Sequence, residues 1–162
     1  MAATDTRAAK TFVARAQQLL AAAGRAGDPE AARLHGLAAD MLRMAEAHDP
    51  GNVKILELGA FARLRRARRL RGEEARSLLR EALEGFQKVE ALAPGHGAYN
   101  TACAYALLGE EERAMEWLKR AKDAGLTPDA SSVSADPDLA VLRGTQWLAD
   151  FVESLPEEDA SS

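Results

Sequence analysis

Hydrophobic residues recur every three or four positions along most of the chain, and this spacing predicts amphipathic helices. Glycine- and proline-containing stretches interrupt the pattern, most clearly GRAGDP at 24–29, HDPGN at 48–52 and APGHG at 93–97. β-Branched residues are sparse, so the sequence offers little material for strands. We predict an all-α protein of three antiparallel helix pairs and a short helical tail near 137–153; the six helices lie near 5–23, 29–48, 52–71, 73–92, 97–108 and 111–124.

The second helices of the three pairs share a pattern of small and large apolar residues. The order A-x-x-x-L-x-x-A-x-x-x-x-P, which begins at Ala38, recurs 44 residues later from Ala82 with Phe and Val in place of Leu and the second Ala. A third copy begins at Ala114 and lacks the proline. Small residues opposite large ones let neighbouring helices approach closely, so the pattern indicates stacked helix hairpins.

The third pair carries the most specific motif. Its sequence, YNTACAYALLGEEERAMEWLKRA, resembles the tetratricopeptide repeat in its small residue at Ala102, its aromatic residue at Tyr105 and its turn glycine at Gly109. The following DPDLAVLRGTQWLADFV is similar to the closing segment of bacterial tetratricopeptide proteins. The first two pairs depart from the family pattern, because their period is longer and neither first helix has the Tyr and Gly at the family spacing.

The resemblance implies a short right-handed superhelix whose first helices line a concave groove for a peptide or a partner's helix. We therefore expect one helical domain over 1–153, built from hairpins at about 5–48, 52–92 and 97–124. The segment 137–153 would cap the stack with its apolar residues, and 154–162 would be an acidic, disordered tail. The cap residues are Leu139, Leu142, Trp147, Leu148 and Phe151.

Six arginines crowd the nine positions from Arg63 to Arg71, although the net charge of the 162-residue chain is -4. On a helix, Leu56, Ala60 and Leu64 belong to an apolar stripe, and most of these arginines point away from it. The run is first interpreted as a solvated face that acids of the next helix, such as Glu74, partly neutralise. It could instead bind an acidic partner, pair with a second copy of the chain, or bind nucleic acid; the last is disfavoured because no aromatic residues interleave with the arginines. The candidate acidic-partner face comprises Arg65, Arg66, Arg68 and Arg69.

Catalytic chemistry has little support in the sequence. His35, His48 and His96 are far apart, and none has a second ligand at metal-binding spacing. Cys103 is the single cysteine, so no intramolecular disulfide can form, and a reducing compartment such as the cytoplasm is expected. No apolar run is long enough to cross a membrane. We predict no enzyme activity, no cofactor and no metal. The abundance of arginine over lysine, together with the abundant alanine, points to a bacterial source.

The function predicted from these observations is that of a non-catalytic protein-interaction module, an adaptor that docks a partner's peptide or helix. Asn100 resembles the asparagine with which some tetratricopeptide clamps hold a peptide carboxylate, although a structural hydrogen bond is the alternative role. Two outcomes are open for the face that contains Cys103: it lines an open groove, or neighbouring helices cover it. The candidate groove residues are Tyr99, Asn100, Cys103 and Leu107.

Overall fold

The computed structural model describes residues 4–156, and every regular element in this range is a helix. The chain divides into two compact units, Met1–Ala93 and Pro94–Ser162. The all-α fold class and the pairing of neighbouring helices are thereby confirmed. The superhelical stacking of all three pairs in one domain stays a prediction. Residues 157–162 of the predicted tail lie outside the described range.

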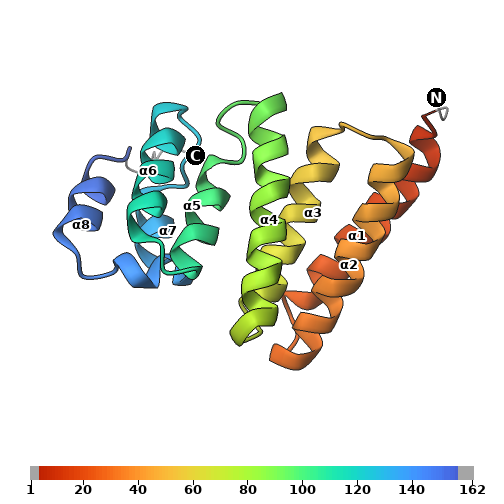
Figure 1. Ribbon diagram of the computed structural model, residues 1–162, viewed down its shortest axis with the longest axis horizontal. Helices are drawn as coiled ribbons and strands as arrows, with labels where there is room; N and C mark the ends of the chain where they lie inside the picture. The colour runs from red at the N-terminus through yellow and green to blue at the C-terminus, as the bar shows by residue number, and fades with distance from the viewer. Residues whose placement is uncertain (1–3, 157–162) are drawn as a thin grey trace, which may run out of the picture. The chain divides into compact units, whose positions relative to one another are not determined.

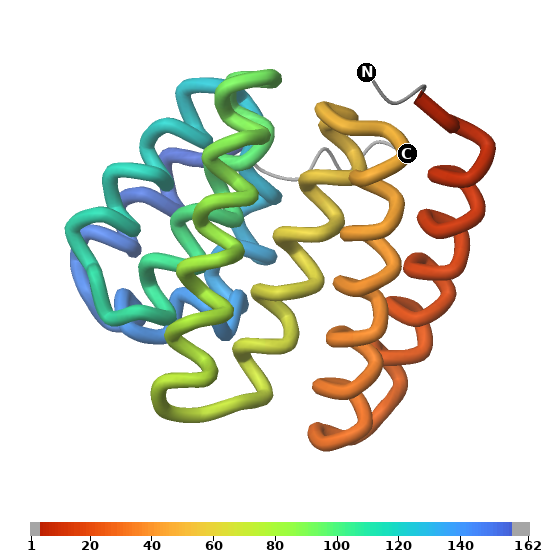
Figure 2. Tube along the Cα trace, turned by 45° about the vertical axis from the view of Figure 1, so that its right-hand side comes forward, coloured from red at the N-terminus to blue at the C-terminus, as the bar shows by residue number. Residues whose placement is uncertain are grey.

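Unit 1 contains four helices that follow one another side by side, each packed on the next (Figures 1 and 2). The short connections reverse the chain direction, so the helices form two hairpins, at 6–48 and 53–92. The helices are α1 (Thr6–Ala23), α2 (Asp28–His48), α3 (Val53–Ala67) and α4 (Gly72–Leu92).

The repeated small and large residues of the second helices form the core. In α2, Ala38 and Leu42 are at most 2% exposed, and in α4 Ala82 and Phe86 are fully buried. The third copy, beginning at Ala114, is equally buried in the second unit. The pattern that defined the repeat in the sequence is therefore a pattern of close packing between helices.

Helix α3 ends at Ala67, whereas the sequence predicted that it continues to Arg71. The backbone N–H groups of Arg69 and Leu70 bond to carbonyls three residues back, at 3.0 and 3.1 Å, so the helix tightens into a turn. Gly72 then begins α4 with a positive φ of 65°, which allows the chain to reverse. The last arginines of the run consequently lie in a connection and not on a helix face.

A close approach between α3 and α4 depends on the absence of a side chain at Gly85. A Cβ atom placed there would lie 2.8 Å from the Cβ of Ala60, well inside van der Waals contact. Glycine at 85 and alanine at 60 thus set the distance between the two helices.

Unit 2 begins with a third hairpin, in which α5 (Ala98–Leu107) packs on α6 (Glu111–Asp123). The predicted helical tail at 137–153 is wrong in detail, because the chain forms two shorter elements there, the 3₁₀ helix η1 (Pro137–Leu142) and α8 (Gln146–Glu153). A further short helix, α7 (Ala130–Ala135), precedes them. Gly144 separates η1 from α8, and its positive φ of 84° is a backbone conformation that a single continuous helix could not contain.

The apolar residues expected to form the cap are mostly buried within this arrangement. Leu139, Leu142, Leu148 and Phe151 are at most 6% exposed, while Trp147 is half-buried and stacks on the Phe151 ring at 5.2 Å. Among the described residues, no helix has the length and apolar character needed to cross a membrane.

Candidate docking groove

An open cleft of about 480 Å³ lies between α1 and α3 in unit 1. Both helices pack extensively on α2, and they approach each other far less closely, so space is left between them. Apolar atoms dominate the surface that the cleft exposes. Its lining residues are Thr6, Ala9, Lys10, Val13, Ala14 and Gln17 of α1, Asp49 and Asn52 of the connection, and Lys54 and Ile55 of α3.

The floor of the cleft is part of the hydrophobic core. Ala9 of α1 and Ile55 of α3 pack together over Ala45 of α2, and Val13 joins this cluster from α1. Alanines at 9 and 14 limit the side-chain volume that α1 places in the cleft at these two positions. The floor is therefore apolar and packed on the core.

The end of the cleft is held by the connection between α2 and α3. The Asn52 side chain caps α3 by accepting hydrogen bonds from the backbone N–H groups of Lys54 and Ile55, at 3.1 and 3.3 Å. Its amide nitrogen donates to the Asp49 carboxylate at 2.8 Å. The one carboxylate in the lining is thus already engaged by a neighbouring amide.

Two lysines stand on opposite rims, Lys10 on α1 and Lys54 on α3, and both are exposed. Within residues 4–156, neither ammonium group has a carboxylate within 4.0 Å. The cleft therefore combines an apolar floor with unpaired positive charge at its edges.

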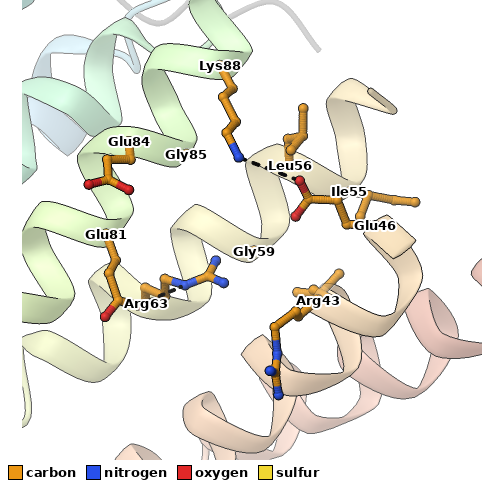
Figure 3. Close-up of a pocket in the computed structure, with 11 residues that line it drawn as sticks. Arg43, Glu46, Ile55, Leu56, Gly59, Arg63, Glu81, Glu84, Gly85 and Lys88 are labelled. Carbon is orange, nitrogen blue, oxygen red and sulfur yellow. Dashed lines mark ion pairs between the residues drawn. The ribbon is translucent and has the colours of Figure 1, made fainter. Parts of the chain in front are cut away.

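A second, smaller hollow of about 160 Å³ lies among α2, α3 and α4, and Figure 3 shows the side chains that line it. Ion pairs link its walls: Arg63 of α3 with Glu81 of α4 at 3.5 Å, and Lys88 of α4 with Glu46 of α2 at 3.7 Å. The second pair spans from α4 to α2, over the surface of α3. The charges of this hollow are thus largely neutralised by its own residues, which leaves little unpaired charge there for a partner.

The arginine run finds partners inside unit 1. Arg66 pairs with Glu74 at 3.5 Å, and Arg69 pairs with Asp28 at the start of α2. The guanidinium of Arg65 lies 4.7 Å from the centre of the Phe61 ring, and Arg68 also has an interaction within the chain. Intramolecular contacts therefore account for the candidate acidic-partner face, and its binding to an acidic partner, a second copy or nucleic acid stays a prediction.

The structure covers the face of α5 that was the other candidate groove. Cys103 is only 1% exposed, and Tyr99 is half-buried and donates a hydrogen bond to Asp136, which precedes η1, at 2.7 Å. Asn100 and Leu107 are half-buried on the same helix. Of the two outcomes left open by the sequence, the covered face is the one observed, because η1 packs on α5. Cys103 is therefore not available to line an open groove.

The contact between α5 and η1 contains a polar cluster that sequence reasoning missed. Ligand atoms of Cys103, Asp136 and Asp138 lie within 4.8 Å of one another, a separation that would suit a metal ion. Asp136, however, caps η1 by accepting the N–H of Asp138 at 2.9 Å, and its other oxygen accepts the Tyr99 hydroxyl. These hydrogen bonds attach η1 to α5 and account for the cluster.

Burial, together with Cys103 and Asp136 nearby, raises the pKa of Tyr99 well above its usual range.

The chain matches no family model, no curated protein and no solved structure. The tetratricopeptide resemblance thus rests on the sequence motif alone.

Proposed function

We propose that this protein is a non-catalytic interaction module that docks a segment of a partner protein in the cleft between α1 and α3. The observation that supports the proposal is the cleft itself, whose accessible surface is mainly apolar and whose floor is formed by half-buried Val13 together with buried Ala9 and Ile55. Exposed apolar surface in a concave site gains free energy when another apolar surface covers it, at about 25 cal/mol per Å².

The dimensions favour a peptide or helix as the occupant. A volume of about 480 Å³ can admit one or two large apolar side chains, while the two rims can contact the backbone or the polar side chains around them. The first helices of two successive pairs provide these rims, which is also where the tetratricopeptide resemblance implies a groove.

The polar lining favours docking over catalysis. Lys10 and Lys54 stand on different helices, and the Asp49 carboxylate is occupied by the Asn52 amide. Among the described lining residues, no serine, cysteine or histidine stands beside a base that could activate it.

We place the module in the cytoplasm of a bacterial cell, as an adaptor, on the evidence of its composition and its single, buried Cys103.

The test blocks the cleft without disturbing the core. Ala14 lines the cleft and its side chain is exposed, so Ala14→Trp fills the space from the surface of α1. Ala47 on α2 is an exposed helical alanine outside the cleft lining, and Ala47→Trp is therefore the matched control. Peptides selected against the full chain from a random 15-residue display library provide the ligands.

We expect the selected peptides to bind the wild type and Ala47→Trp equally and to lose binding to Ala14→Trp, as measured by fluorescence anisotropy. Far-UV circular dichroism of each variant checks that the helices are intact. A selection that yields no binders, or binders that Ala14→Trp does not affect, would show that this cleft is not a docking site.

A further inference from the structure

We infer that the segment docked between α1 and α3 is acidic, with carboxylates flanking the apolar side chain that enters the cleft. The inference rests on the proposed function and specifies the chemistry of the partner. It is carried by the distribution of unpaired positive charge around the cleft.

Helix α1 is unusual in its charge. From Thr6 to Ala23 it contains Arg7, Lys10 and Arg15 and no aspartate or glutamate, in a chain whose net charge is -4. Lys54 adds a cation from the opposite rim, at the positive end of the α3 dipole. Within the described range, Arg7, Lys10 and Lys54 have no carboxylate within 4.0 Å.

Several cations on the other helices of unit 1 have acidic partners within the chain. Ion pairs engage Arg33 with Glu30 at 2.7 Å, Arg63 with Glu81 at 3.5 Å, and Lys88 of α4 with Glu46 at 3.7 Å. On these helices several bases therefore have an acid next to them, although the exposed Arg76 of α4 has no carboxylate within 4.0 Å in the described range. At the cleft the same chain leaves its bases without acids, so a partner that supplies carboxylates gains attraction without breaking an existing pair.

The burial of α1 and the residue types that line the cleft favour a peptide over a lipid or a nucleic acid. The apolar side of α1, including Ala9 and Ala16, is buried in the core and is not available to enter a membrane. No aromatic side chain is present among the residues that line the cleft, so bases would find no stacking platform. An amphipathic acidic segment can place its apolar side chains on the floor and its carboxylates beside the lysines of the rims.

The experiment uses the composition of the selected peptides and a charge reversal on the full chain. The display library is selected against the wild type and depleted against Ala14→Trp, so that the retained peptides occupy the cleft. Their aspartate and glutamate content is compared with that of the unselected library. Binding is then measured for Lys10→Glu/Lys54→Glu and for a control, Arg25→Glu/Arg76→Glu, which makes the same charge change at exposed arginines outside the lining.

We expect acid-enriched peptides that bind Lys10→Glu/Lys54→Glu about tenfold more weakly than the wild type at about 50 mM salt. The control should retain most of the affinity, and raising the salt to about 300 mM should reduce the difference because exposed charges are screened.

Three results would overturn the inference. Cleft-binding peptides without acid enrichment would refute the acidic partner and leave the docking function standing. A selection with no cleft-dependent binders would refute both. Binding of a labelled oligouridylate or of phosphatidylserine vesicles that depends on Lys10 and Lys54, with no acid enrichment among the peptides, would assign the positive rims to a different class of ligand.

Discussion

The contact between Gly85 and Ala60 provides a sharp test of how α3 and α4 are packed. The substitution Gly85→Ala places a methyl group 2.8 Å from the Cβ of Ala60, about 1 Å short of an ordinary carbon–carbon contact. Neither Cβ can rotate away, because each is fixed to a helix backbone. The helices must therefore separate or shift, which loosens the packing around buried Leu64 and Phe86.

The magnitude follows from two opposing effects. Overpacking a well-filled core costs about 1–3 kcal/mol, and the rigid contact at 2.8 Å places this case near the upper end. Replacing glycine by alanine inside a helix returns about 1 kcal/mol. The net expectation is that Gly85→Ala lowers the free energy of unfolding by about 2 kcal/mol.

Gly59 on α3 is the matched control. A Cβ there would lie 3.2 Å from the Nη1 atom of Arg63, the far end of a flexible side chain that can move. Gly59→Ala should therefore leave stability unchanged or raise it by up to about 1 kcal/mol. In the exchanged variant Ala60→Gly/Gly85→Ala only one methyl group occupies the contact, so it should recover most of the stability that Gly85→Ala loses.

The assay is urea unfolding followed by circular dichroism at 222 nm, with tryptophan fluorescence recorded in parallel. Both tryptophans, Trp117 and Trp147, belong to unit 2, so dichroism reports the whole chain and fluorescence reports unit 2. The reasoning is refuted if Gly85→Ala is as stable as Gly59→Ala, or if the exchanged variant shows no recovery.

Three further predictions concern buried polar groups. Burial, with smaller effects from Arg69 and Arg68, lowers the pKa of His35 below its ordinary 6.5, so the unfolded chain binds the proton more readily than the folded one. The free energy of unfolding should therefore fall as the pH drops from 6.5 to the folded pKa. His35→Leu should reduce that fall, as measured by urea titrations at a series of pH values. Tyr99→Phe should cost about 1 kcal/mol in urea unfolding, because it deletes the hydrogen bond to Asp136, and an unchanged midpoint would argue against that bond. Cys103, 1% exposed, should react with a maleimide far faster in urea than in the native protein; rapid native labelling would mean that η1 does not cover α5.

Several features of the protein could be predicted from its sequence because they depend on local spacing. Helix periodicity and the Gly and Pro breaks located the six long helices to within a few residues, apart from the end of α3. The repeated positions beginning at Ala38, Ala82 and Ala114 were recognisable because the packing of adjacent helices repeats along the chain. The absence of acids from α1 can also be read from the sequence, and it is the signal that would have pointed to the cleft.

The candidate site could not be predicted in the same way. Periodicity showed that Tyr99 and Cys103 share a face of α5, but it could not show that a segment more than 30 residues later lies against that face. The pairing of Arg69 with Asp28, 41 residues apart in the chain, was equally invisible.

The sequence by itself determined the helices and the face of each that is apolar, since both follow from the 3.6-residue turn of the helix. Only the tertiary structure decided which apolar and charged faces were covered and which stayed open. That outcome depends on the distances between helices, set at contacts such as Gly85 with Ala60, and on where the chain returns after a turn. The cleft between α1 and α3 exists because both helices pack on α2 and small residues keep its floor low, a relation among three segments that no local pattern encodes.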